Sequence, residues 1–365
     1  MSCFLEDLMN KDKIYNILML IVVIALSFLM GLKLATYVFA DDFLTGYLLL
    51  ILMIIVAVVL QTILHEAGHL VFGLLTGYRF LSFRIISFIW LKDEGKIRLK
   101  RYMLPGTLGQ CLMAPPPYSD RFPYVLYNLG GALMNLIVSA VFFVLYMFIQ
   151  QRIVKGACLA MVFYGVISAL ANGVPLRTRY VNNDGMNIVE AARDPDAKRA
   201  FWQQLKINEL LTQGVRPRDM PFELFMYPEG KVTSSTLVAG IKIMNESRAM
   251  DSGDYQHAYE LIMQLLSQGE KLGGLYRYVL INDKEYLDCM YNRYAPLNDP
   301  GYIKYRKQML GRSISTIRTE IAIAKTTGDF ARINGLLSQF ETAAAKYPYR
   351  RELEGERELV RLVVG

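Results

Sequence analysis

The first half of the chain consists of long apolar runs separated by short polar segments, a pattern that predicts membrane-spanning helices. The run from Ile14 to Met30 is almost unbroken, and crossing a bilayer takes about 20 apolar residues. A second run begins near Phe43, a third covers about residues 123–149 and a fourth covers about residues 156–171. We therefore expect a mainly α-helical, polytopic membrane protein with four transmembrane helices.

Residues 78–104, between the second and third runs, are aromatic, β-branched and basic. The turn sequence Asp93-Glu94-Gly95, with partial alternation after it, predicts a β-hairpin over this stretch. Residues 106–120 follow and include three consecutive prolines. Because proline interrupts regular structure, we expect this segment to be an irregular loop.

Residues 194–365 have the composition of a soluble helical domain. Two segments in it begin with Gly-Asp-aromatic, at residues 253–255 and 328–330, and continue with apolar residues three and four positions apart. These helix starts resemble the second half of tetratricopeptide helix hairpins. An irregular helical domain with two similar helix starts explains the pattern equally well.

Charge indicates the orientation in the membrane. Residues 78–121 carry eight Lys or Arg against three Asp or Glu, and loops rich in Lys and Arg stay in the cytoplasm. An even number of spans puts both termini on one side. We therefore expect both termini, the hairpin and residues 194–365 to be cytoplasmic, in the plasma membrane of a prokaryote.

Composition supports a division into parts. The chain is 53% hydrophobic and 20% charged, against roughly 45–50% and 25% in soluble domains. Residues 1–193 hold 16 basic and 11 acidic residues, whereas residues 194–365 hold 24 and 22. This contrast excludes a single globular domain, a disordered chain and a disulfide-rich secreted scaffold. We expect an additional N-terminal transmembrane helix in residues 1–42, a three-span core in residues 43–193 and a helical domain in residues 194–365.

The net charge of +7 and the four cysteines change this picture little. The cysteines are scattered and form no CxxC pair, so they indicate neither a disulfide framework nor a thiolate metal site. Many basic residues flank apolar segments, where orientation in a membrane accounts for them. No nucleic-acid partner is therefore expected.

His65, Glu66 and His69 form the pattern HExxH near the far end of the second apolar run. On a helix, positions i and i+4 share a face, so both imidazoles can bind one metal ion. Glu66 then lies beside the metal, where a carboxylate can take a proton from a bound water. Two imidazoles and a carboxylate are costly in a membrane helix without a partner, so this segment predicts a metal site.

A catalytic zinc ion takes three protein ligands and leaves one position for water. Asp184 is the best candidate for the third ligand, because it follows the fourth run on the same side of the membrane as the histidine pair. Glu190 is an alternative, and Asp120 lies on the same side in a polar loop. His257 belongs to the soluble half and is a poor candidate.

These residues resemble the motifs of the site-2 protease family of intramembrane zinc metalloproteases. The resemblance rests on HEAGH at 65–69 and on NGVP at 172–175 followed by Asp184-Gly185. It covers about residues 43–190 and implies a three-span core with the metal towards the cytosol. Eight residues separate Pro175 from Asp184, where the family usually has four, and Asp184 is still the best match.

The resemblance also implies roles for individual residues. It makes three side chains the Zn²⁺ ligands, namely His65, His69 and Asp184. It makes Glu66 the catalytic base. Asn135 lies in the segment that matches the family's middle-span motif, although Ala132 stands where that motif usually has proline. Asn135 and Asn172 are expected to support the substrate or the transition state, while a structural hydrogen bond between helices explains Asn135 equally well.

The function that follows is zinc-dependent hydrolysis of a peptide bond in or near a substrate's transmembrane segment. The expected partners are a membrane-spanning or membrane-associated polypeptide and the lipid bilayer, and residues 194–365 are a candidate docking surface for a regulatory protein. In the family, a hairpin or loop at this place contacts extended substrate. An amphipathic hairpin lying on the lipid surface is the alternative.

Two other functions are compatible with the motif. One is a membrane-embedded zinc peptidase of another family, with a glutamate as third ligand and lipidated or small peptides as substrates. The other is a membrane metal-binding scaffold without enzymatic activity. A carrier would keep its function when Glu66 is replaced by Gln, whereas a protease would lose turnover.

Overall fold

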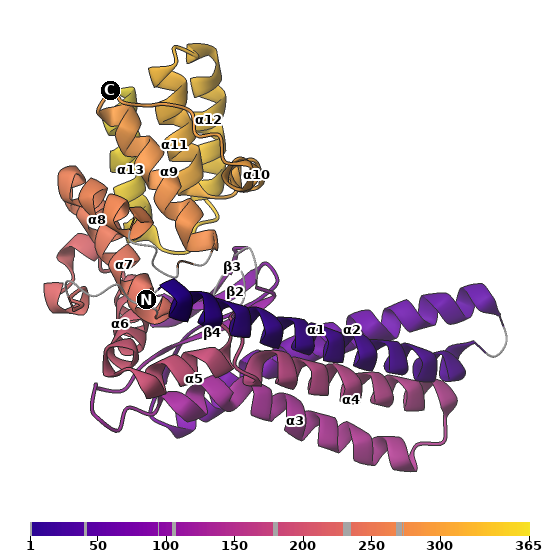
Figure 1. Ribbon diagram of the computed structural model, residues 1–365. Coiled ribbons are helices and arrows are strands. Elements are labelled where there is room, and N and C mark those ends of the chain that lie inside the picture. Colours follow the sequence, from indigo (N-terminus) through magenta and orange to yellow (C-terminus); the bar gives the residue numbers. More distant parts are fainter. Residues whose placement is uncertain are drawn as a thin grey trace. The chain divides into compact units, whose positions relative to one another are not determined.

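The computed structural model describes residues 2–39, 42–93, 95–103, 107–177, 182–228, 235–267, 272 and 274–365 (Figure 1). The chain divides into two compact units. We call the first the membrane unit; it comprises Met1–Ile86, Thr107–Thr178 and Asn182–Ala192. We call the second the helical unit, and its main segments are Ser87–Gly106 and Arg193–Gly365.

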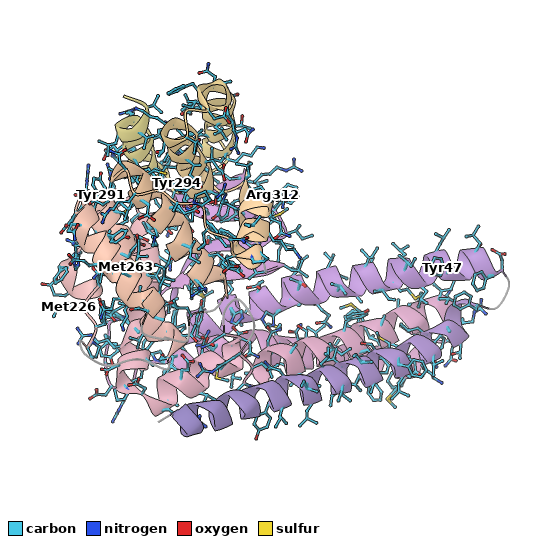
Figure 2. The ribbon with its side chains drawn as sticks, turned by 45° about the horizontal axis from the view of Figure 1, so that its top comes forward. Tyr47, Met226, Met263, Tyr291, Tyr294 and Arg312 are labelled. Atoms are coloured by element: carbon cyan, nitrogen blue, oxygen red, sulfur yellow. The ribbon has the colours of Figure 1, made fainter. Side chains whose placement is uncertain are left out.

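Four helices of the membrane unit are long and apolar enough to cross a membrane, as the apolar runs predicted. They are α1 (Ser2–Val38), α2 (Phe43–Leu75), α3 (Tyr124–Phe148) and α4 (Arg152–Gly173). Large apolar side chains are exposed along their outward faces, and Tyr47 lies near the start of α2 (Figure 2). Such exposure is typical of helices whose solvent is lipid.

Local sequence explains where the spans begin and end. The Asp42 carboxylate accepts a hydrogen bond from the backbone N–H of Thr45 (2.8 Å) and caps the start of α2. Gln151 caps α4 in the same way. At the other end, α4 stops at Gly173 because the residue before Pro175 is disfavoured in helical conformation. A short helix, α5 (Asp184–Arg193), follows.

Two antiparallel strands of the membrane unit, β1 (Arg79–Ile85) and β4 (Gly109–Ala114), pair with Phe83 opposite Cys111. The expectation of an irregular loop over 106–120 is therefore wrong for residues 109–114. Cys111 and Met113 are buried on one side of β4, which is the period-two burial of a strand. The prolines begin at residue 115, so they end the strand rather than prevent it.

The predicted hairpin is confirmed as β2 (Phe88–Asp93) and β3 (Lys96–Arg101), which pair antiparallel in the helical unit. Gly95 has a φ of +81°, which suits glycine in a tight turn, and Glu94 lies outside the described residues. The hairpin is shorter than the predicted stretch of 78–104. The first part of that stretch forms β1, whose partner β4 comes later in the chain.

The rest of the helical unit is a series of helices. They are α6 (Pro195–Thr212), two short 3₁₀ helices at Pro217–Asp219 and Phe222–Leu224, α7 (Thr236–Ser252), α8 (Tyr255–Ser267), α9 (Gly274–Met290), α10 (Pro300–Met309), α11 (Ile314–Thr326), α12 (Phe330–Ala344) and α13 (Arg350–Val364). Both Gly-Asp-aromatic sequences do start helices, α8 and α12. Their glycines, Gly253 and Gly328, end the preceding helix with φ of +79° and +76°. A tetratricopeptide architecture stays a prediction.

A buried ion pair lies in the core of the helical unit. The guanidinium of Arg318 is 2% exposed, lies 3.0 Å from the Glu356 carboxylate and also pairs with Asp283. It stacks over the ring of Tyr286 at 4.5 Å. Burial raises the pKa of Glu356 to about 7, in spite of the opposing effect of Arg318. Arg318 is thus the shared cation of a buried carboxylate, Asp283, and a partly buried one, Glu356.

We expect Arg318→Met to lower the free energy of unfolding by about 3–5 kcal/mol, because the buried Asp283 and the partly buried Glu356 lose their shared cation. The loss should be larger above pH 7 than below it. Below its pKa of about 7 the Glu356 carboxyl takes up a proton, and a neutral carboxyl is less costly to bury without a cation. Thermal unfolding of the purified full chain in detergent, on either side of pH 7, measures both effects.

Arg351→Met is the matched control. Arg351 lies 3.0 Å from Glu354, and both side chains are exposed. Surface ion pairs contribute about 0–1 kcal/mol, so this variant should unfold close to wild type. Equal losses in the two variants would contradict the account of the buried pair.

Candidate metal centre

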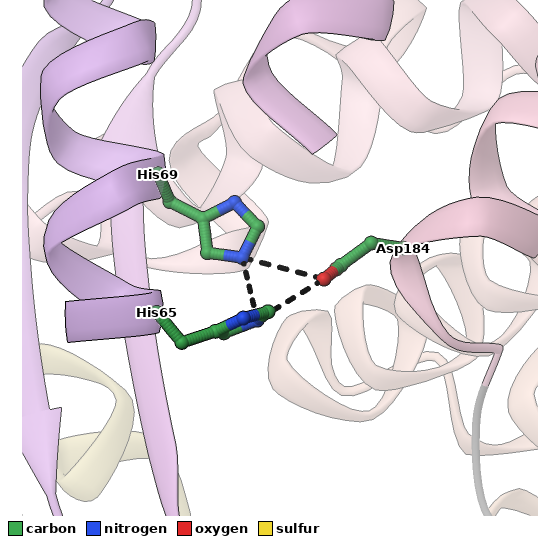
Figure 3. Close-up of side chains that lie close together, drawn as sticks. All are labelled: His65, His69 and Asp184. Carbon is green, nitrogen blue, oxygen red and sulfur yellow. Dashed lines mark hydrogen bonds and ion pairs between the residues drawn. The ribbon is translucent and has the colours of Figure 1, made fainter. Parts of the chain in front are cut away.

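Two helices bring three metal-binding side chains together (Figure 3). His65 and His69 lie on one face of α2, and Asp184 is the first residue of α5. The two Nε2 atoms are 3.2 Å apart, and Asp184 Oδ2 lies 3.3 Å from the Nε2 of His65 and 3.4 Å from that of His69. Within the described residues, this group has the geometry to hold a metal ion.

Backbone and side-chain acceptors orient the two imidazoles. Nδ1 of His69 lies 2.8 Å from the carbonyl oxygen of Tyr127, and Nδ1 of His65 lies 2.8 Å from Oδ1 of Asn135. A carbonyl oxygen only accepts, so each Nδ1 must donate. The proton on Nδ1 leaves the Nε2 lone pair of each ring free to bind a metal on the side of Asp184.

A polar network behind His65 fixes which end of the Asn135 amide meets the imidazole. Asn135 Nδ2 donates to the backbone oxygen and to Oε1 of Gln61 (2.9 and 2.7 Å). Its Oδ1 also accepts from the hydroxyl of Ser168 (3.1 Å). Gln61 in turn donates to the Met161 carbonyl (2.8 Å). Asn135 therefore holds His65 in place and is 0% exposed.

Asn183 positions Asp184 by joining the end of α4 to the start of α5. Its Nδ2 donates to two carbonyl oxygens at the end of α4 (2.6 and 2.7 Å). Its Oδ1 accepts from the backbone N–H groups of Leu176 and Met186 (3.0 and 2.9 Å). Asp184 follows directly and is thereby held facing the histidines.

The same contacts accommodate the eight-residue spacing between Pro175 and Asp184. Residues 177 and 182 form an isolated β-bridge, and the N–H of Asn183 donates to the Leu176 carbonyl (3.3 Å). The ends of the longer connection are thus drawn together. Gly185 lies so close to α4 that a Cβ on it would meet the Gly173 carbonyl oxygen at 2.3 Å.

The charges around Asp184 favour a cation next to its carboxylate. Burial on its own would raise the pKa of this carboxyl. When the imidazoles are protonated, positive charge at His69 and hydrogen bonds from the Nε2–H groups of both rings outweigh burial and lower the pKa below its ordinary value. The carboxylate is therefore ionised next to a site of positive charge, which is the condition that a bound cation supplies.

Comparison with known proteins places the chain in a family. Residues 50–344, more than half of the chain, match the profile of Peptidase family M50. The chain belongs to peptidase family M50, the site-2 protease family. It is therefore a membrane metalloprotease, and the resemblance seen in its motifs is confirmed. Comparisons with curated proteins and with solved structures gave no match.

The other candidate ligands of this M50 peptidase lie elsewhere. Glu190, two turns further along α5, is 3.0 Å from the guanidinium of Arg177. Asp120 is exposed in a turn before α3, and His257 is exposed on α8 of the helical unit. Asn172 Nδ2 donates to the Ser168 carbonyl (2.9 Å), one turn earlier in α4.

Glu66 lies beside the three candidate metal ligands and against β4. It is 8% exposed, and a Cβ on Gly109 would come within 2.5 Å of its Oε1. The close approach therefore requires glycine at the start of β4. Among the described strands, β4 is at the edge of the sheet with β1 as its neighbour.

Two buried polar residues that support this region were not predicted from the sequence. Gln61 precedes His65 by one helical turn, and a lone amide in an apolar run was the signal. Arg84 is 0% exposed, and its guanidinium donates to the carbonyls of Ile86 and Gly109 (2.9 and 3.2 Å) and to the Thr107 hydroxyl. It joins the two points at which the chain leaves and re-enters the membrane unit.

We expect Gly131→Ala to weaken metal binding by about 10–100-fold, the usual effect of disturbing groups that orient a ligand. Gly131 on α3 faces His65, and a Cβ on it would lie 2.4–2.6 Å from the imidazole ring. The ring would have to leave the position in which its Nε2 lies 3.3 Å from Asp184 Oδ2. Metal content of the purified variant after dialysis against graded metal concentrations measures the change.

Gly335→Ala in α12 is the control for this prediction. An added Cβ there meets nothing within 4 Å, so metal content should equal that of wild type. Unchanged metal affinity in Gly131→Ala would show that the His65 ring does not depend on this close contact.

Proposed function

We propose that this M50 peptidase is a zinc metalloendopeptidase that hydrolyses a peptide bond in or near a substrate's transmembrane segment. The observation that carries the proposal is the triangle of ligand atoms formed by His65, His69 and Asp184, with sides of 3.2–3.4 Å. Tetrahedral zinc with bonds of about 2.0–2.1 Å separates its ligand atoms by about 3.3 Å. The donor set of two imidazoles and one carboxylate fits zinc, and it leaves a fourth position for water.

Glu66 is the proposed general base. Zinc, when bound, polarises a carbonyl and makes its water acidic enough to lose a proton near neutral pH. Glu66 takes that proton and returns it to the leaving amine. The carboxylate lies against Gly109, so the space open to it is limited before substrate arrives.

The two asparagines have different proposed roles. Asn135 supports the site through His65, because its amide is engaged by the imidazole and by Gln61. It is a positioning residue in this proposal. Asn172, at the end of α4, is proposed to support the substrate or the transition state.

The substrate is proposed to bind in an extended form along β4. A transmembrane helix hides its carbonyls in hydrogen bonds, so it must unwind before a peptide bond can be cut. An edge strand pairs with an extended peptide by strand addition. Because β4 begins at Gly109 against Glu66, a segment added to this edge passes the proposed base.

Location and partners follow from the same proposal. The basic loop after α2 favours a cytoplasmic site with both termini in the cytoplasm, in the plasma membrane of a prokaryote. The substrate is a membrane-spanning or membrane-associated polypeptide. The helical unit is proposed to dock a regulatory protein.

Replacing Glu66 by Gln separates a protease from a metal-binding scaffold. We expect Glu66→Gln to keep its zinc and to lower turnover by about 10²–10⁴-fold, the usual contribution of a general base. Candidate single-span proteins are co-expressed with wild type or with the variant, and their processing is compared. An uncut protein that accumulates with the variant alone supports hydrolysis. Equal processing by both rules out Glu66 as the base.

A second comparison separates Asp184 from Glu190 as the third ligand. We expect Asp184→Ala to weaken zinc binding beyond the roughly 10–100-fold effect of outer residues. Glu190→Gln should bind zinc like wild type, because Glu190 is engaged by Arg177. Zinc content of the two purified proteins gives the answer. Loss of zinc in Glu190→Gln alone would favour the glutamate-ligand type of peptidase.

A further inference from the structure

One face of the β2–β3 hairpin is apolar and exposed. Trp90 and Leu99 are cross-strand neighbours at its centre, 39% and 57% exposed. Phe88 and Ile97 extend the apolar surface on either side, 42% and 64% exposed. We call this surface the outer face of the hairpin. Its members, which alternate along both strands, are Phe88, Trp90, Lys92, Ile97, Leu99 and Arg101.

The opposite face of the hairpin contacts the rest of the helical unit through Lys100, which lies opposite Ile89 and donates to the Pro348 carbonyl (3.1 Å). Ile89 and Leu91 are each 2% exposed. Just beyond the strands, Tyr102 meets Tyr347 edge-on with ring centroids 5.8 Å apart. These contacts fix which side of the hairpin is covered, and the outer face is left as the exposed side.

Basic side chains lie at both ends of the outer face. Lys92 is opposite Ile97, and Arg101 is opposite Phe88, with its guanidinium 5.2 Å from the centre of the Phe88 ring. Residues 87–103 carry five basic and two acidic side chains in all. The hairpin therefore combines an apolar centre with an excess of positive charge.

We propose that the outer face docks on an anionic lipid surface. Tryptophan and phenylalanine favour the boundary between headgroups and acyl chains. Lys92 and Arg101 can lay their aliphatic stems along the apolar centre and extend their charges to lipid phosphates. The positive charge of the hairpin complements the negative cytoplasmic leaflet. This proposal rests on the proposed cytoplasmic side of the hairpin, and it does not depend on the proposed hydrolysis.

Trp90 offers a direct probe, because the chain has two tryptophans and Trp202→Phe leaves Trp90 alone. The full-length variant is reconstituted in vesicles of phosphatidylcholine and phosphatidylglycerol whose acyl chains carry bromine near the headgroup or near the methyl end. Both leaflets are identical, so the orientation of the protein does not matter. We expect Trp90 fluorescence to be quenched, and more strongly by bromine near the headgroup.

A tryptophan elsewhere on the helical unit is the control. Phe330, at the start of α12, is 66% exposed, and a protein with Trp90→Phe, Trp202→Phe and Phe330→Trp carries one tryptophan there. We expect its fluorescence to be unaffected by the brominated lipids. Quenching of Trp90 no greater than this control would overturn the proposal. Blue-shifted but unquenched Trp90 would overturn it as well and show that protein covers the face.

The contribution of charge is tested with matched pairs of substitutions. Removing both basic residues, by Lys92→Gln with Arg101→Gln, should lower the ratio of docked to free hairpin by roughly 30-fold in anionic vesicles. Lys304→Gln with Lys346→Gln removes two exposed lysines elsewhere in the unit, one on α10 and one in the turn after α12, and should leave the ratio unchanged. Equal quenching in the two proteins would overturn the anionic-lipid assignment.

Discussion

An imidazole inside an apolar helix is costly unless its polar atoms find partners. Both histidines of α2 meet this condition through α3, because His65 donates to the side chain of Asn135 and His69 to the backbone of Tyr127. Asn135 in turn needs partners and finds Gln61, one turn before His65. These bonds fix the rotation of α2 against α3. The remaining ring nitrogens are thereby turned towards Asp184. The need to satisfy the polar atoms of the two imidazoles therefore places all three candidate metal ligands together.

Hydrogen bonds of this length between helices require their backbones to be close, and glycine makes that possible. A Cβ on Gly68 of α2 would meet the Gly130 carbonyl of α3 at 2.2 Å, and a Cβ on Gly131 would enter the His65 ring. Small residues let membrane helices approach in this way. Gly131 therefore acts directly on a candidate ligand, because it leaves room for the His65 imidazole. In this unit, the same close packing of α2 and α3 also orients the candidate ligand His65.

The sequence was informative where the chemistry is local. The apolar runs predicted the four spans, and the i, i+4 spacing put His65 and His69 on one face. It could not show how Asp184 reaches them, because that depends on Asn183 joining the end of one helix to the start of another. β4 was missed since six residues give a weak alternation beside prolines. Gln61 and Arg84 were missed because their partners lie far along the chain or in the backbone.

The connection between β1 and β4 carries the hairpin that we propose to dock on lipid, and it leaves the candidate metal ligands undisturbed. The chain leaves the membrane unit after Ile86 and returns at Thr107, and the buried guanidinium of Arg84 binds backbone at both points. It also binds the carbonyl of Gly109, whose α-carbon lies against Glu66. The position of Glu66, the proposed base, thus depends on contacts within the membrane unit. Substitutions on the outer face of the hairpin can therefore leave the candidate metal ligands and the edge of β4 unchanged.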